Sequence, residues 1–180
     1  MIYTSKELLK KYETRYNIKK AIENKELFKL DNGIYSDKDL VNPMIVASKK
    51  YPSAIITMDS AFYYYDLTDV IPHKTYIATN RNSNVIKKEN IVQIKVPKEI
   101  LNQGKEIVII DNEEVKIYNR ERLLVELIRK RNQIPFDYYK EIISNYRKIS
   151  DDLDMYKIEE YIALYKNEQN LGNVLLREVF

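Results

Sequence analysis

Residues 4–35 read TSKELLKKYETRYNIKKAIENKELFKLDNGIY, and this stretch decides the expected fold of the amino-terminal part of the chain. A Thr-Ser pair followed by Glu7 is typical of a capped helix start, so the sequence predicts a short helix over residues 5–11. After a turn, apolar side chains recur at i, i+3 and i+4 from Arg15 onward. This spacing predicts a second helix with one buried stripe.

A hairpin is expected directly after these two helices. The motif Asp31-Asn32-Gly33 separates two short apolar runs, and Asn-Gly favours the dihedral angles of a tight hairpin turn. Helix, turn, helix and hairpin within 35 residues predict a winged helix-turn-helix, whose second helix would enter the major groove of DNA. Because the residue before a proline avoids the helical region, Asn42-Pro43 predicts the end of this domain.

The expected fold class is therefore α+β. A winged helix-turn-helix over residues 1–42 would be followed by a second domain over residues 43–180. Short apolar runs separated by turns predict a small mixed sheet with a few helices in residues 43–118. Helical periodicity then takes over and predicts a helical segment over residues 119–180.

The composition excludes several classes of protein. The chain has 180 residues with no Cys and a single His, His73, so it lacks the side chains for thiol nucleophiles, Cys-rich zinc sites and multi-His metal centres. Three Gly residues are too few for the common phosphate-binding loops. We therefore expect no cofactor and no metal, and no nucleotide-dependent enzyme of the familiar kinds. The sequence also lacks a long apolar run and a signal-peptide pattern, which predicts a cytoplasmic protein without a membrane partner.

Positive charge is concentrated at the amino terminus. Residues 1–35 carry eight Lys and Arg against five Asp and Glu, whereas the rest of the chain is balanced, so the whole net charge of +3 lies there. Such asymmetry is typical of a polyanion-binding module on a neutral body. A solvated Lys-rich helix face is the plainer alternative. The residues expected to contact DNA are Thr4, Ser5, Arg15, Tyr16, Asn17, Lys19, Lys20, Lys25, Lys29 and Asn32.

Two smaller basic patches fall in the helical segment. They are expected near the carboxyl ends of predicted helices, where the helix dipole favours positive charge without any ligand. A second contact surface for DNA or RNA is the alternative interpretation. The residues concerned are Arg129, Lys130, Arg131, Arg147 and Lys148.

A few acidic residues leave a different chemistry open. Asp111 and Glu114 resemble the acidic element of metal-dependent nucleases, but they flank one turn and are expected to form a solvated hairpin tip. Asp66 and Asp69 are expected to be turn and cap residues, and His73 a loop residue. A metal-dependent nuclease or nucleotidyltransferase using these carboxylates stays an alternative. A module that docks a protein partner through its carboxyl-terminal helices is another.

Several short motifs together resemble one family. In chain order they are Gly33-Ile34-Tyr35, Ser60-Ala61, residues 67–72 (LTDVIP), residues 76–79 (YIAT), residues 121–124 (ERLL), residues 126–129 (ELIR) and Asn145-Tyr146. In this order they resemble the AbiEi family of antitoxins and transcriptional autoregulators from type IV toxin–antitoxin systems, which act in abortive infection and antiviral defence.

The resemblance implies a specific biology. Such a protein would not be an enzyme but a repressor that binds inverted repeats of double-stranded DNA in its own promoter, with possible cooperative self-association on DNA. It would also be an antitoxin that counters a cognate nucleotidyltransferase-like toxin without forming a stable complex. These expectations come from the resemblance and not from composition or spacing.

Overall fold

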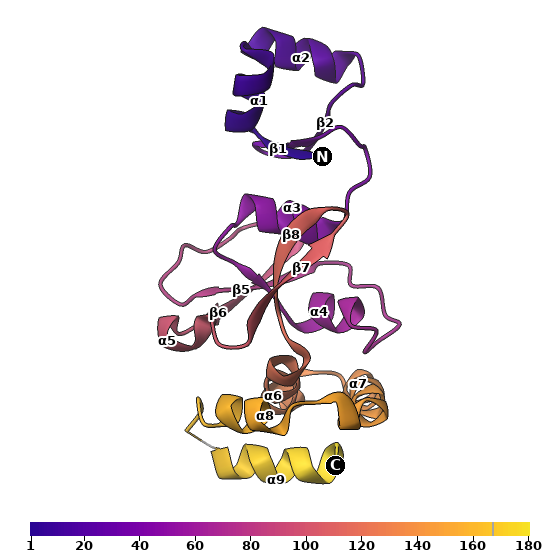
Figure 1. The fold of residues 1–180 in the computed structure, drawn as a ribbon, viewed down its shortest axis with the longest axis vertical. Helices are drawn as coiled ribbons and strands as arrows, with labels where there is room; N and C mark the ends of the chain where they lie inside the picture. Colours follow the sequence, from indigo (N-terminus) through magenta and orange to yellow (C-terminus); the bar gives the residue numbers. More distant parts are fainter. Residues whose placement is uncertain (167) are drawn as a thin grey trace. The chain divides into compact units, whose positions relative to one another are not determined.

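A computed structural model describes residues 1–166 and 168–180, which fall into two compact units (Figure 1). The first unit contains residues 1–54 and residues 108–115. The second contains residues 55–107 and residues 116–180. The division therefore follows Ala54, and the helix after Asn42 belongs to the first unit. The expected domain boundary after Asn42 stays a prediction.

The first unit begins with a strand, which the sequence did not predict. This strand pairs with the second strand of the expected hairpin, so the unit holds a three-stranded antiparallel sheet of order β1-β3-β2. No finding identifies the unit as a winged helix-turn-helix, and that finer assignment stays a prediction. The elements are β1 (Ile2–Thr4), α1 (Ser5–Tyr12), α2 (Arg15–Glu23), β2 (Phe28–Asp31), β3 (Ile34–Ser36) and α3 (Pro43–Lys50).

Local signals explain how these elements begin and end. The Thr4 hydroxyl accepts a hydrogen bond from the Glu7 amide at 3.3 Å, and the Glu7 carboxylate accepts one from the Thr4 amide at 2.6 Å. This is the capping box that the sequence predicted for α1. Gly33 has a φ of +81° in the hairpin turn. Both helices bury one stripe against the hairpin, in a small core of Leu8, Ile18, Ala21 and Leu27.

The second unit is built on a mixed sheet of order β6-β5-β4-β8-β7. Strand β4 runs antiparallel to β5 and parallel to β8, and β5 runs parallel to β6. The tip of the β7–β8 hairpin, residues 108–115, belongs to the first unit. The elements are β4 (Ile55–Ile56), α4 (Met58–Tyr64), β5 (Thr75–Asn80), β6 (Ile91–Val96), α5 (Lys98–Leu101), β7 (Lys105–Ile110) and β8 (Glu113–Tyr118).

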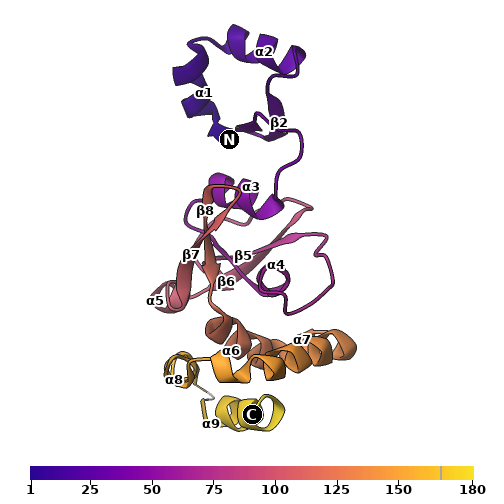
Figure 2. The same cartoon turned by 45° about the vertical axis from the view of Figure 1, so that its right-hand side comes forward.

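Helices form the remainder of the second unit, as the sequence predicted. Figures 1 and 2 show α6, α7, α8 and α9 gathered together, and α6 packs against α4, α8 and α9. Helix α6 is buried over eight consecutive residues because it packs against the helices α4, α8 and α9. The elements are α6 (Arg120–Lys130), the 3₁₀ turn η1 (Arg131–Gln133), α7 (Phe136–Lys148), the 3₁₀ turn η2 (Ser150–Asp152), α8 (Met155–Ile162) and α9 (Glu168–Glu178).

The α+β class is thus confirmed, with its small sheets and a helical carboxyl-terminal part. Within the described ranges 1–166 and 168–180, none of the helices has the length and apolar character needed to cross a membrane.

Candidate functional site

A cavity of about 250 Å³ lies where strand β4 passes into helix α4. Met58 opens the helix with a φ of +44°, an unusual value for a side chain of this size. Strained backbone of this kind tends to occur at functional sites. The strained turn places Asp59 on the cavity wall. The cavity is lined by Met58, Asp59, Tyr76, Val92, Ile94, Lys130, Gln133, Ile134, Pro135 and Tyr138.

The polar groups of this cavity have perturbed pKa values. Burial raises the pKa of the Asp59 carboxyl, and a hydrogen bond from the Tyr76 hydroxyl opposes part of that rise. Burial, together with the Asp59 charge, raises the pKa of Tyr76 to about 12. Burial lowers the pKa of Lys130, and the nearby charge of Arg129 lowers it further. A half-buried acid and base with shifted pKa values in one cavity are typical of a functional site.

Tyr138 adds a buried hydroxyl to the same cavity wall. Burial and the Asp59 charge raise its pKa, and an interaction with the Thr68 side chain opposes part of that rise. The cavity therefore combines one carboxylate, one amine and two tyrosines.

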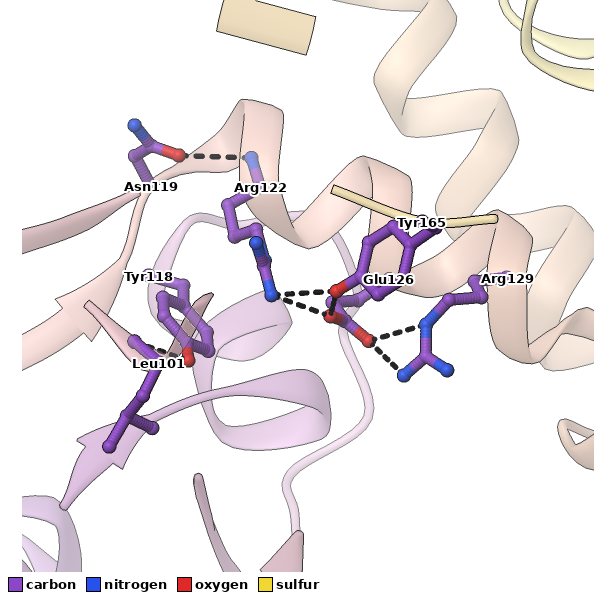
Figure 3. Close-up of polar contacts among 7 residues, drawn as sticks. All are labelled: Leu101, Tyr118, Asn119, Arg122, Glu126, Arg129 and Tyr165. Carbon is purple, nitrogen blue, oxygen red and sulfur yellow. Dashed lines mark hydrogen bonds and ion pairs between the residues drawn. The ribbon is translucent and has the colours of Figure 1, made fainter. Parts of the chain in front are cut away.

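A second group of polar residues lies in the interior beneath α6 (Figure 3). Arg122 is fully buried, and its Nη2 donates to the Glu126 carboxylate at 3.0 Å and to the Tyr165 hydroxyl at 2.7 Å. Arg129 Nη2 donates to the same carboxylate at 2.7 Å. The rings of Tyr118 and Tyr165 lie 5.2 and 5.5 Å from the Arg122 guanidinium carbon. This network joins α6 to the segment that follows α8.

The five basic residues expected to form a second contact surface have different surroundings in the structure, and the surface itself stays a prediction. Arg129 is bound to Glu126, and Lys130 lines the cavity beside Asp59. Arg131 and Arg147 line a different cavity on the other side of η1 and α7. Lys148 is exposed and donates to the Asn145 side chain at 2.8 Å. Arg129, Lys130 and Arg131 are neighbours in the sequence at the end of α6, but each has a different set of contacts.

The residues expected to contact DNA are spread over the first unit. Arg15, Tyr16, Lys19 and Lys20 are exposed on α2, where the sequence placed them. Asn17 is engaged locally, since its side-chain amide donates to the Tyr12 carbonyl at 2.9 Å. The others are exposed or half-buried and lie at the start of α1, in the turn after α2 and in the hairpin: Thr4, Ser5, Lys25, Lys29 and Asn32.

The acidic residues of the alternative hypothesis, a metal-dependent nuclease or nucleotidyltransferase, lie in the turns and loops where the sequence placed them. Asp66 is exposed in a turn with a φ of +56°. The peptide of Asp69 donates to the Glu141 carboxylate at 3.1 Å, which anchors the loop after α4. Asp111 has a φ of +49° in the tight turn of the β7–β8 hairpin, and Glu114 is exposed beside it. Neither pair lines the cavity that contains Asp59.

Comparison with known proteins places the chain in a family. A family model described as "Nucleotidyl transferase of unknown function (DUF2204)" matches residues 75–177, more than half of the chain. The chain belongs to this family. All lining residues of the Asp59 cavity except Met58 and Asp59 fall in the segment that matches the DUF2204 model. None of the curated proteins matches the sequence.

One solved structure supports the fold. The crystal structure of the RV2827C protein from Mycobacterium tuberculosis superimposes with a TM-score of 0.68, over 97% of this chain and 71% of that chain. The two sequences are 12% identical, so this similarity concerns the fold alone.

The DUF2204 match corrects the expected identity. The AbiEi assignment was wrong, and with it the expectation of a non-enzymatic antitoxin that represses its own operon, because the matching family is described as a nucleotidyl transferase. No finding supports double-stranded DNA or a cognate toxin as a partner. The alternative of a nucleotidyltransferase agrees better with the match, although its expected carboxylates do not line the cavity described above.

Sequence reasoning missed the residues of the cavity. Asp59 follows a two-residue strand, which is too short to show a pattern, and the strained φ of Met58 is not visible in a sequence. Tyr76 and Tyr138 could not be distinguished from the other tyrosines of a chain that contains 16 of them. The available signal was a carboxylate three residues after a buried apolar strand, a common place for functional side chains at a strand end.

Proposed function

We propose that this chain is a nucleotidyltransferase whose active site is the cavity containing Asp59, Tyr76, Lys130 and Tyr138. The observation that carries the proposal is the presence of a carboxylate and an amine with oppositely shifted pKa values in one cavity lined chiefly by the family-matched segment. Catalytic sites are where such pairs of perturbed groups are concentrated.

The chemistry follows from the two charged groups. In nucleotidyl transfer, an acceptor hydroxyl attacks the α-phosphorus of a nucleoside triphosphate, the new O–P bond forms, and the bond to pyrophosphate breaks. Asp59 would accept the proton of the attacking hydroxyl, and its raised pKa makes it a better base than an exposed carboxylate. Lys130 would balance the negative charge of the phosphates at the cavity.

Tyr76 and Tyr138 would shape the site around these groups. The hydrogen bond from the Tyr76 hydroxyl holds the Asp59 carboxylate in place, so Tyr76 acts as a positioning residue. Tyr138 contributes a ring and a buried hydroxyl to the wall. Apolar side chains, Val92 and Ile94 among them, make up much of the remaining wall, which strengthens the electrostatic interactions inside.

Enzymes that transfer nucleotides commonly hold two divalent cations on clustered carboxylates. The cavity offers one carboxylate, Asp59, and in the part of the chain that the structure describes no three His, Cys, Asp or Glu side chains could hold an ion together. The residues present therefore do not fit a two-cation centre. The roles given above belong to side chains of this chain alone.

The proposal is tested with the purified full chain, α-labelled nucleoside triphosphates and an RNA acceptor mixture. Asp59→Asn is expected to lower label transfer and pyrophosphate release by roughly 10²–10⁴-fold, the usual contribution of a general base. Asp66→Asn is the matched control, because Asp66 lies in an exposed turn outside the cavity, and should leave the rate unchanged.

Nucleotide binding gives a readout that does not depend on the acceptor. Amide NMR shifts on titration with each triphosphate should concentrate around residues 58–59, 76 and 130–138, and Lys130→Met should weaken the interaction. Absence of binding at millimolar nucleotide, or equal turnover of the Asp59→Asn and wild-type proteins, would overturn the proposal.

We also propose that residues 1–42 form a winged helix-turn-helix module attached to a domain of residues 43–180. The capped α1, the exposed basic side chains of α2 and the hairpin that follows support this assignment. Its basic residues, Arg15, Lys19 and Lys20 among them, would contact phosphates of a nucleic-acid substrate. Affinity for a single-stranded acceptor should then fall with salt, with a log–log slope of about 0.7 for each phosphate neutralised. A salt-independent affinity would contradict this role.

A further inference from the structure

A separate cavity of about 690 Å³ lies among η1, α7 and the end of α9. Its size is within the range of about 300–1,000 Å³ that is usual for small-molecule sites. The segment from Lys130 to Lys140 lies between this cavity and the Asp59 cavity, and all of its residues except Asp137 line one cavity or the other. The lining residues are Arg131, Asn132, Phe136, Tyr139, Lys140, Ile143, Ser144, Arg147 and Glu178.

The cavity carries a net positive charge. Three cationic side chains and one carboxylate line it, and the Glu178 carboxylate is already bound by the Tyr139 hydroxyl at 2.6 Å. Arg147 Nε donates to the Glu178 carbonyl at 2.6 Å, which fixes the guanidinium at the wall. Among the described residues its two terminal amino groups make no hydrogen bond and remain for a ligand. A guanidinium held in this way is well suited to bind a phosphate through two parallel bonds.

An aromatic ring stands beside these cations. Phe136 lines the cavity and its side chain is 67% exposed, which is unusual for a residue of this kind. Lys140 Nζ lies 4.5 Å from the centre of the ring, so the ring and the amine are held close together. Cations next to an exposed ring are typical of sites that bind unpaired nucleotides, because the base stacks while the phosphate is neutralised.

We propose that this cavity binds an unpaired nucleotide, with its phosphate on Arg131, Lys140 and Arg147 and its base against Phe136. The nucleotide is either free or the end of a single strand. The role of this cavity as the acceptor site of a transfer reaction rests on the proposed function. The binding itself does not depend on that function and is measured without turnover.

Fluorescence anisotropy and calorimetry with the full-length chain test the proposal. The probes are a nucleoside monophosphate, inorganic phosphate, and a labelled ten-nucleotide single strand of RNA or DNA. Lys140→Gln and Phe136→Leu should each weaken binding by about tenfold, which corresponds to the loss of one charged hydrogen bond or one stacked base. Arg147→Gln should weaken it at least as much. Tighter binding of the strand than of the monophosphate identifies a strand end, and equal binding identifies a free nucleotide.

Lys148→Gln is the matched control. It removes the same charge one residue further along α7, outside the cavity, and should leave affinity within about twofold. Equal weakening by Lys148→Gln would show that only net charge matters, and failure of every probe to bind at millimolar concentration would exclude a nucleotide site. Equal competition by an acidic peptide would also overturn the proposal. Because Asp59→Asn leaves this cavity intact, loss of turnover without loss of strand binding separates failure of one proposal from failure of the other.

Discussion

Replacing Glu126 by glutamine is expected to lower the free energy of unfolding by about 3–5 kcal/mol. Glu126 is 4% exposed and is the carboxylate that balances Arg122, which has no exposed surface. Within the described residues, the Nε and Nη1 atoms of Arg122 have no hydrogen-bond partner, so its charge depends on Glu126. Arg129 contributes less, because its side chain is 37% exposed and water can solvate it. The loss therefore comes mainly from a buried guanidinium left without its counter-charge.

The measurement is urea unfolding of the full chain followed by circular dichroism at pH 7. A loss of this size should also lower the melting temperature by roughly 10 °C for a protein of this length. Glu23→Gln is the control, since Glu23 forms an exposed pair with Lys19 at 3.7 Å and should change stability by less than about 0.5 kcal/mol. A loss below about 1 kcal/mol for Glu126→Gln would refute the reasoning, because it would mean that water or another group reaches Arg122.

The same carboxyl predicts a pH dependence. Burial opposes ionisation of Glu126, but the charges of Arg129 and Arg122 outweigh it and lower the pKa below its ordinary value of 4.5. A group with a lowered pKa in the folded state stabilises the fold above its unfolded pKa, and this contribution is lost as the pH falls through the folded value. The stability difference between the wild type and Glu126→Gln should be constant above about pH 5.5 and shrink in acid. A difference that grew in acid would contradict the assigned direction.

Three further predictions use the same unfolding assay. Gly104→Ala should cost more than 1 kcal/mol, because Gly104 has a φ of +74° and a new Cβ would lie 2.6 Å from the Arg122 Cβ; an unchanged midpoint would show that the turn can adjust. Thr4→Ala should cost about 1 kcal/mol through loss of the capping box, while Thr4→Ser should retain most of it. Asp59→Asn should stabilise the protein at neutral pH, because the pKa of Asp59 is raised in the folded state and the wild type therefore loses stability as the pH rises through that pKa. The stability gained by the variant should vanish below about pH 3.8, where the carboxyl is protonated in both the folded and the unfolded state. A variant less stable than the wild type at pH 7 would contradict this.

Signals within a few residues predicted the local elements well. The capping box at Thr4 and Glu7 and the Asn32-Gly33 turn act over three or four residues, and both are present in the structure. Strand β1 could not be predicted in this way. It has three residues, and its partner β3 lies about 30 residues further along the chain. Its stability comes from that pairing and not from any pattern of its own.

The functional assignment failed where the argument depended on long-range packing. The basic residues of α2 favoured DNA binding because charge and helix spacing are visible within a short stretch of sequence. The cavity of Asp59, Tyr76 and Lys130 is instead assembled from three segments that are distant in the sequence. The resemblance to AbiEi proteins was built from short motifs of this local kind. A family model that uses residues 75–177 together gave a different answer.

Three cations of α6 show why composition could not separate structural from functional charge. Arg122, Arg129 and Lys130 are all cations of one helix, and the sequence treats them alike. In the fold, Arg122 faces the tyrosines of the interior, Arg129 turns to the Glu126 carboxylate, and Lys130 reaches the Asp59 cavity. Buried pairs of this kind contribute little net stability compared with an apolar replacement, so Arg122→Met combined with Glu126→Leu should be more stable than Glu126→Gln alone. If the double variant is the less stable one, the network itself stabilises the helical part, and its role is more than the avoidance of an unpaired charge.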